Sequence, residues 1–289
     1  MTATPVAAPR KLIELTVDDI IVRVSEGSTL LQACRGADPQ CDIPTLCYGE
    51  TLTPKNACRV CMVELDGSRT LVPSCSRKAE AGMVVRTKTE RTDTSRRMVL
   101  EFLGSSVDLS TTANIADWNE QYGVDTDRHG VTAETVNQPT KIDNELYVRD
   151  YAKCILCYKC VDACGPQWQN TFAIAVAGRG FGSHISAEFD ATLPDSACVY
   201  CGNCIQVCPT GALMFTTEHT MRAEGTWHED RQVQTDTVCP YCGVGCSVTL
   251  HVQDNEIVKT SSPSDSSVTH GNLCIKGRFG FQHVQNRPG

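Results

Sequence analysis

The residues in this chain best suited to chemistry are its cysteines, which number 18 among 289 residues. Most of them fall into four groups with regular spacing, and long stretches without cysteine separate the groups. Thiolates bind soft metals or pair as disulfides, so an abundance of this size has to serve one of the two.

The composition favours metal binding over disulfides. The N-terminus lacks the apolar core of a signal peptide, and no stretch approaches the ~18 uninterrupted apolar residues of a membrane span. We therefore expect a cytoplasmic protein, in which thiols stay reduced and are available to metals. The formal net charge of -8 argues against a nucleic-acid partner, because phosphate binding needs a basic face.

The first group is a CxxC pair with one cysteine upstream and one downstream. It comprises Cys47, Cys58, Cys61 and Cys75. Four thiolates in a loop beside a predicted sheet suit a [2Fe-2S] cluster, in which each iron takes two of them, and a zinc site is the alternative. Cys34 and Cys41 lie outside this pattern, and we interpret them as structural or incidental thiols.

The second and third groups are two CxxCxxCxxxC runs. They comprise Cys154, Cys157, Cys160 and Cys164, and then Cys198, Cys201, Cys204 and Cys208. In two-cluster bacterial ferredoxins the fourth cysteine of each run ligates the other cluster. The pattern therefore predicts two [4Fe-4S] clusters, the first bound by Cys154, Cys157, Cys160 and Cys208 and the second by Cys198, Cys201, Cys204 and Cys164. Zinc at paired CxxC sites is again the alternative.

The fourth group begins with the tetrapeptide CPYC. It comprises Cys239, Cys242, Cys246 and Cys274. CPYC alone is also the active-site sequence of glutaredoxins, where the pair opens a helix after a strand. Here a third cysteine follows at once and a strand comes next, so a third [4Fe-4S] cluster is the better interpretation.

Hydrophobic periodicity predicts short strands and few helices. Two strands lie in residues 11–27 around a turn at Asp18 and Asp19, and a capped helix begins at Ser25 or Ser28. A helix over 94–104 is capped by Asp93 or Thr94 and ended by Gly104. Further strands are predicted at 61–67, 83–89, 246–252 and 256–260, a glycine-rich hairpin at 177–185, and a linker at 225–237.

Residues 43–67, IPTLCYGETLTPKNACRVCMVELDG, resemble the ferredoxin-type entry domain of a known group of oxidoreductases. That group contains NAD-linked formate dehydrogenase alpha subunits, the large peripheral iron-sulfur subunit of complex I, and NAD-reducing hydrogenases. The fourth group, with its distant CxKG, resembles the N-terminal [4Fe-4S] segment of molybdenum or tungsten bis-pterin oxidoreductases. In that family the lysine matching Lys276 lies on the path between cluster and pterin.

The resemblance covers roughly residues 11–287 and implies an α+β chain resembling the iron-sulfur arm of a formate dehydrogenase alpha subunit. Four domains follow from it. They are a β-grasp [2Fe-2S] ferredoxin domain at 11–92, a helical connector at 93–150, a two-cluster ferredoxin-like domain at 151–222, and a small β-rich [4Fe-4S] domain at 237–289.

The connector departs from the family pattern. Related enzymes bind a further cluster there through one histidine and three cysteines, and alignment on Asp108 places other residues at those positions. They are Ser105, Leu109, Thr112 and Trp118. We therefore expect this cluster to be missing.

These patterns predict an electron relay with no catalytic residue of its own. No glycine-rich nucleotide loop opens a helix, so we expect FMN or NAD on a partner chain, and the molybdenum- or tungsten-bis-pterin on a catalytic partner subunit. The alternatives are the small diaphorase subunit of an NAD-reducing hydrogenase, which would stop before Cys239, and a zinc-stapled scaffold without redox activity.

Overall fold

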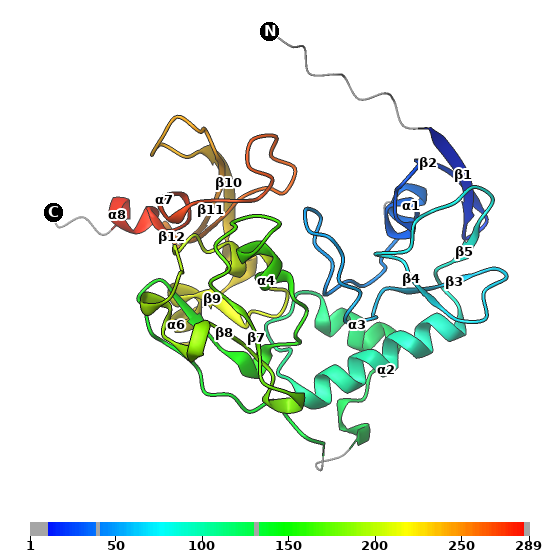
Figure 1. The fold of residues 1–289 in the computed structure, drawn as a ribbon, viewed down its shortest axis with the longest axis horizontal. Coiled ribbons are helices and arrows are strands. Elements are labelled where there is room, and N and C mark those ends of the chain that lie inside the picture. The colour runs from blue at the N-terminus through cyan, green and yellow to red at the C-terminus, as the bar shows by residue number, and fades with distance from the viewer. Residues whose placement is uncertain (1–10, 39–40, 130–132, 286–289) are drawn as a thin grey trace, which may run out of the picture. The chain divides into compact units, whose positions relative to one another are not determined.

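The computed structural model describes residues 11–38, 41–129 and 133–285 (Figure 1). The chain forms two compact units, each assembled from several segments. The first takes Met1–Leu46, Pro54–Phe102 and Ala116–Arg128, and the second takes Cys47–Thr53, Leu103–Ile115 and His129–Gly289. Residues of the predicted ranges 151–222 and 237–289 therefore lie in one unit.

The first unit is built on a five-stranded sheet in the order β2-β1-β5-β3-β4. Its strands are β1 (Leu12–Val17), β2 (Ile20–Ser25), β3 (Met62–Leu65), β4 (Val72–Pro73) and β5 (Val84–Arg86). Strands β1 and β5 are parallel, and the other neighbours are antiparallel. The side chains of Ile13, Leu15 and Val17 alternate into the core, as the period of a half-exposed strand requires.

The predicted turn between β1 and β2 is confirmed. Asp18 and Asp19 have φ of 47° and 68°, and Val17 pairs with Ile20, so two residues close the hairpin. Helix α1 (Leu30–Ala37) follows, but Thr29 caps it rather than Ser25 or Ser28. The Thr29 hydroxyl accepts a hydrogen bond from the Gln32 amide while the Gln32 side chain accepts one from the Thr29 amide.

Helix α2 (Glu90–Ser106) is longer than predicted at both ends. It begins before Asp93 because the Thr89 hydroxyl accepts a hydrogen bond from the Thr92 amide at 3.2 Å, and it continues past Gly104. Helix α3 (Ile115–Tyr122) lies in the predicted helical connector, beyond the one helix whose bounds were predicted there. It buries Trp118 and Tyr122, and the Tyr122 hydroxyl accepts a hydrogen bond from Arg96 on α2.

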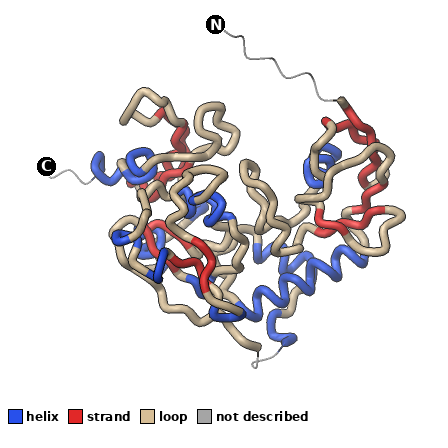
Figure 2. Tube along the Cα trace, in the orientation of Figure 1, coloured by secondary structure: helices blue, strands red, loops and turns tan. Residues whose placement is uncertain are grey.

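The second unit contains two small antiparallel sheets and short helices joined by many loops (Figure 2). The sheets pair β6 (Tyr147–Arg149) with β9 (Leu213–Phe215) and β7 (Ala175–Ala177) with β8 (His184–Ser186). The β7–β8 hairpin confirms the prediction at 177–185. Strand β6 is a correction, because it lies in the range predicted to be a helical connector. The helices are α4 (Lys159–Cys164), α5 (Asn203–Val207) and α6 (Thr216–Ala223).

A three-stranded sheet and two short helices complete this unit. They are β10 (Val233–Val238), β11 (Ser247–Gln253), β12 (Glu256–Ser261), α7 (Ile275–Phe279) and α8 (Phe281–Gln285). Strands β11 and β12 confirm the prediction, whereas β10 shows that the linker predicted at 225–237 is wrong. All six residues of β10 are exposed, so the strand has no apolar alternation for sequence analysis to detect.

The C-terminal helices share a core with the ferredoxin-like part of the unit. The ring of Phe279 lies 5.3 Å from Phe215 and 6.1 Å from Tyr147, centroid to centroid. Short 3-10 helices occur at Thr126–His129, Tyr151–Lys153, Gly180–Gly182, Glu188–Asp190, Leu193–Asp195 and Glu229–Arg231. Among the described residues, no helix is both long and apolar enough to cross a membrane.

Candidate metal centres

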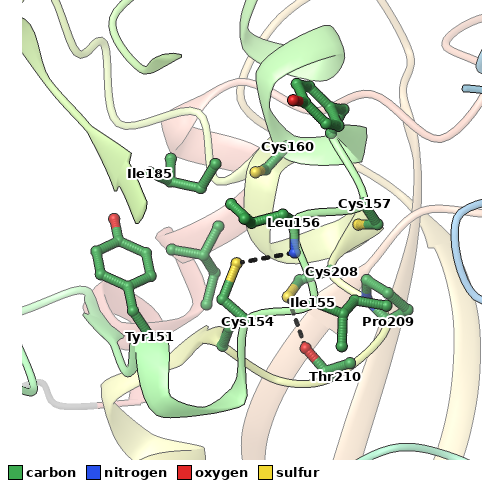
Figure 3. Close-up of a pocket in the computed structure, with 13 residues that line it drawn as sticks. Tyr151, Cys154, Ile155, Leu156, Cys157, Cys160, Ile185, Cys208, Pro209 and Thr210 are labelled. Atoms are coloured by element: carbon green, nitrogen blue, oxygen red, sulfur yellow. Dashed lines mark hydrogen bonds between the residues drawn. The ribbon is translucent and has the colours of Figure 1, made fainter. Parts of the chain in front are cut away.

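One cavity of the second unit is lined by four cysteines from two distant segments (Figure 3). They are Cys154, Cys157, Cys160 and Cys208. The rest of the wall is mostly apolar and includes Leu156, Ile185 and Pro209. Three cysteines therefore come from the run beside α4, and the fourth comes from the end of the run beside α5.

A second cavity repeats this arrangement with the roles of the runs exchanged. Its cysteines are Cys164, Cys198, Cys201 and Cys204. Tyr147, Arg149 and Leu193 contribute to the same wall. Each cavity thus takes three thiols from one run and one from the other.

The backbone conformation that presents these thiols is also repeated. Leu156 and Tyr158 have φ of 51° and 67°, and the matching residues Tyr200 and Gly202 have 55° and 68°. These left-handed residues turn the chain so that the Leu156 amide points at Cys154 Sγ and the Tyr200 amide at Cys198 Sγ, each at 3.4 Å. Amide donors of this kind stabilise negative charge on sulfur and tune cluster potentials.

Without metal, these thiols strongly favour their protonated form. Burial raises the pKa of Cys154 to about 11 and that of Cys157 to about 12. Burial, followed by the charges of neighbouring cysteines, raises the pKa of Cys160 and Cys204 well above the ordinary value. Metal binding displaces these protons, so bound iron would compensate the buried sulfur charge.

Two buried arginines lie at or near the second cavity. Arg149 lines that cavity and forms an ion pair with Asp143 through Nη2, while its Nε and Nη1 have no hydrogen-bond partner among the described residues. Arg278 is fully buried, and in the described part of the chain its partners are neutral oxygens of Cys201, Asn203, Gln206 and Thr260. Asp143 compensates the charge of Arg149, whereas Arg278 has no acidic partner among the described residues, and cluster thiolates and sulfides would supply its compensating negative charge.

The fourth group lies at the surface of the second unit. Cys239 is buried and Cys246 partly buried, whereas Cys242 and Cys274 are exposed. The Cys239 amide donates to the Cys246 carbonyl at 2.8 Å. Burial and the nearby thiols of Cys239, Cys242 and Cys274 raise the pKa of Cys246, so the four cysteines lie near one another. Lys276 is exposed on α7.

The first group is divided between the two units. Cys58, Cys61 and Cys75 belong to the first unit, where Cys61 and Cys75 are buried. The carbonyl of Cys61 accepts hydrogen bonds from the amide and hydroxyl of Ser74. Cys47 belongs to the segment 47–53 of the second unit, where Thr51 and Thr53 are hydrogen-bonded to Trp168 and Gln167.

In the described residues, no group of three or more His, Cys, Asp or Glu side chains is arranged around a single metal ion. In a [4Fe-4S] cluster each cysteine binds a different iron, and in a [2Fe-2S] cluster each iron takes two cysteines, so the four ligands need not converge on one point. At the positions aligned with the additional cluster of related enzymes, Leu109, Thr112 and Trp118 are buried side chains without a metal-binding sulfur or imidazole.

Some residues of chemical interest were not recognised from the sequence. Cys34 and Cys41 were interpreted as structural or incidental thiols, yet they line one cavity together and their side chains are hydrogen-bonded to each other. The buried arginines were also missed, because nothing in local sequence separates a buried arginine from a solvated one.

Three models of protein families match separate parts of the chain. The family model of the 2Fe-2S iron-sulfur cluster binding domain matches residues 10–90, and that of the 4Fe-4S dicluster domain matches 153–212. The model of the molybdopterin oxidoreductase Fe4S4 domain matches residues 233–286. The chain is an iron-sulfur electron-transfer protein.

The chain is also similar over nearly its whole length to larger oxidoreductase subunits. It is 31% identical to an NADH-quinone oxidoreductase subunit of Rhizobium meliloti, over 96% of this chain and 32% of the relative. It is 29% identical to NADPH-Fe(3+) oxidoreductase subunit alpha of Geobacter sulfurreducens, over 95% and 32%. With "Putative formate dehydrogenase SH0748" of Staphylococcus haemolyticus it shares 27% identity, over 94% and 31%.

The chain therefore spans about a third of the length of the curated relatives it matches. Among solved structures, it resembles a chain in the crystal structure of an NAD+-reducing [NiFe]-hydrogenase in the H2-reduced state. The TM-score is 0.60 at 24% identity, and the match covers 71% of this chain and 87% of that one. At that identity the likeness shows the fold alone.

Proposed function

We propose that the chain carries one [2Fe-2S] and three [4Fe-4S] clusters and relays single electrons between two partner chains. The observation that carries this proposal is the pair of cavities, each lined by three cysteines of one run and one of the other. The sheet of the first unit, with β1 parallel to β5, supports a β-grasp fold around the [2Fe-2S] cluster.

The ligand sets follow from this assignment. The [2Fe-2S] cluster takes Cys47, Cys58, Cys61 and Cys75. The first [4Fe-4S] cluster takes Cys154, Cys157, Cys160 and Cys208, the second takes Cys164, Cys198, Cys201 and Cys204, and the third takes Cys239, Cys242, Cys246 and Cys274. When bound, the clusters supply one-electron redox chemistry at potentials that burial and hydrogen bonds to sulfur adjust.

The protein's own residues hold and insulate these sites. Buried side chains exclude water from the two paired cavities, while the buried Arg278 provides positive charge that stabilises an added electron. The Cys47 loop is hydrogen-bonded through Thr51 and Thr53 to the segment just after Cys164.

We assign the surface around the fourth group as the docking end for a molybdenum- or tungsten-pterin catalytic chain. Cys242, Cys274 and Ile275 are exposed there, and so is every residue of β10. Lys276 would bridge from the third [4Fe-4S] cluster toward the pterin. A flavin- and NAD-linked chain, or another iron-sulfur acceptor chain, is the second partner.

The cluster content is tested by anaerobic iron and sulfide analysis of the purified chain. Two irons and three times four give about 14 irons per chain. About 18 would mean that the additional cluster of the family is bound after all. About two irons with stoichiometric zinc would exclude the relay.

Cross-ligation is tested by electron paramagnetic resonance of single variants. Cys164→Ser should alter the cluster bound mainly by the second run, and Cys208→Ser the one bound mainly by the first. A Cys164→Ser signal changed only in the cluster of Cys154, Cys157 and Cys160 would contradict the assignment.

The docking end is tested in the assembled complex with formate as electron donor. Lys276→Ala should slow electron transfer from the catalytic chain without changing the iron content, whereas Cys274→Ser should remove the third cluster. Unchanged turnover in Lys276→Ala would refute the role given to the lysine.

A further inference from the structure

Cys34 and Cys41, neither of which is assigned to a cluster, form a thiol pair in the first unit. Cys34 lies on α1 and is fully buried, while Cys41 is partly exposed. The Asp38 amide donates to the Cys34 carbonyl at 3.2 Å, and the Cys41 amide donates to the Asp38 carbonyl at 2.8 Å. The two side chains line the same cavity and are hydrogen-bonded to each other.

The two thiols differ in their readiness to ionise. Their mutual hydrogen bond is the largest influence on both: it raises the pKa of Cys34, together with burial, and lowers the pKa of Cys41 to about 7. Cys34 thus keeps its proton and donates a hydrogen bond to the sulfur of Cys41. Burial and the carboxylates of Asp18 and Asp38 oppose the ionisation of Cys41.

A cavity gives small molecules access to this pair. It has a volume of about 330 Å³ and is lined by both cysteines. Arg86 and Lys88 lie in its wall together with the carboxylates of Asp18, Asp19 and Asp38, so its charges are mixed rather than uniformly acidic. A partly exposed thiol of lowered pKa beside a protected second thiol is the arrangement of an attacking and a resolving cysteine.

We propose that Cys34 and Cys41 are a redox-active dithiol that low-molecular-weight disulfides such as glutathione disulfide oxidise reversibly. The Cys41 thiolate attacks one sulfur of glutathione disulfide, forming a mixed disulfide and releasing one glutathione thiolate. The Cys34 thiol then loses its proton and attacks Cys41 Sγ, which forms the Cys34–Cys41 disulfide and releases the second glutathione. Two electrons pass from the pair to the oxidant, and excess glutathione reverses both steps.

The Cys34–Cys41 disulfide would constrain the chain between α1 and the segment before Cys47. It would tie the end of α1 to the start of the segment that leads to Cys47, a proposed ligand of the [2Fe-2S] cluster. The inference itself does not rest on the proposed relay, because neither thiol belongs to a cluster ligand set.

The test uses the full chain with its clusters, equilibrated anaerobically in glutathione buffers of increasing oxidised fraction. After free thiols are alkylated, cleavage before Asp38 and Asp42 places Cys34, Cys41 and Cys47 on three different peptides. Mass spectrometry without reduction should find the Cys34 and Cys41 peptides joined, and thiol treatment should separate them. The iron content should stay constant across the series.

Two variants separate the attacking cysteine from the resolving one. Cys34→Ala should trap glutathione on Cys41, and Cys41→Ala should leave Cys34 reduced in every buffer. In the wild-type chain, alkylation of Cys41 should be at least about tenfold faster than that of Cys34 and should rise with pH through about 7.

Two results would overturn the proposal. One is a wild-type chain in which Cys41 accumulates glutathione while Cys34 remains reduced. The other is a chain in which the Cys34 and Cys41 peptides stay separate in every buffer, including the most oxidising.

Discussion

The paired cavities and the C-terminal cysteine group lie in the same unit but differ sharply in their protection from water. In the paired cavities Cys157 and Cys160 are buried, and the remaining six thiols are partly buried. In the C-terminal group Cys242 and Cys274 are exposed, and only Cys239 is buried. The same thiol chemistry is thus enclosed in one region and open in the other.

The difference separates two tasks of an electron relay. Enclosed sites keep water and oxidants from the clusters and let buried charges such as Arg278 act at low dielectric. An open site brings a cluster close to a partner surface, at the cost of weaker protection. If enclosure stabilises the paired cavities and exposure weakens the C-terminal site, changes in the two regions should differ in their effects on Tm and on iron release.

The largest contrast is expected from removing one ligand in each region. Cys160→Ser places a hydroxyl in the shared core of two clusters, whereas Cys242→Ser changes an exposed loop. Each variant should lose about four irons. Cys160→Ser should also lower Tm by about 5 °C or more, because bound metal stabilises the folded core, while Cys242→Ser should have a much smaller effect. Equal losses of Tm in calorimetry would mean that metal binding in the two regions contributes equally to the stability of the fold.

Iron release to a chelator should follow the same division. An anaerobic excess of a ferrous chelator should remove about four of 14 irons in a first phase, from the exposed C-terminal site, before the rest. Electron paramagnetic resonance of the partly depleted chain identifies which signal has gone. Cys242→Ser serves as the control, since it should lack the first phase, and a single-phase release from the wild-type chain would contradict the comparison.

The grouping of the cysteines in two cavities was more predictable from sequence than the elements around them. The two repeated cysteine runs predicted two clusters and their crossed ligands, because metal geometry restricts the spacing of CxxC ligands. The turn at Asp18 and Asp19 was found for a similar reason, since few residues tolerate positive φ.

Features that depend on tertiary contacts were not predictable. Three hydroxyl residues before α1 could each cap a helix, and only packing selects Thr29. Strand β10 is held by pairing with β11 and buries none of its own side chains, so it was assigned to a linker. The meeting of Cys34 and Cys41, and the burial of Arg278 against Asn203, likewise depend on how the chain returns on itself.

Arg278 lies on α7 in the C-terminal part of the unit and donates a hydrogen bond to the carbonyl of Cys201 in the ferredoxin-like part. Its substitution should have a smaller but more specific effect. Arg278 follows Lys276 on α7, and burial lowers its pKa only to about 10, so it remains charged at neutral pH near Cys201 and Cys204. Arg278→Gln should make the midpoint potential of the second [4Fe-4S] cluster more negative by roughly 50 to 100 mV, because a buried positive charge stabilises the reduced state. A redox titration monitored by electron paramagnetic resonance measures the shift.

Arg278→Lys provides the matched control, because it retains the charge but not the planar hydrogen-bonding group. It should keep the potential nearer to the wild-type value. Equal shifts in Arg278→Lys and Arg278→Gln would assign the effect to packing instead of charge.

The smallest effect concerns His251, which lies on β11 and is hydrogen-bonded to Ser261 at 2.8 Å. Burial lowers its pKa to about 4, and Lys259 contributes in the same direction. The unfolded chain, with an ordinary pKa of about 6.5, therefore binds this proton at a higher pH than the folded chain does. This difference adds to the free energy of unfolding above about pH 6.5, and the contribution is lost as the pH falls toward about 4.

Between pH 7 and pH 5.5 this linkage should reduce the free energy of unfolding by about 1 kcal/mol at most, and Tm by a few degrees. His251→Gln removes the titrating group and retains a hydrogen-bonding side chain, so its Tm should fall less than that of the wild-type chain over this range. The exposed His283 supplies the control, because His283→Gln should leave the wild-type slope unchanged. Comparing slopes between variants cancels the acid sensitivity of the clusters, which all three chains share. A His251→Gln slope equal to the wild-type slope would show that protonation of this histidine does not weaken the C-terminal sheet.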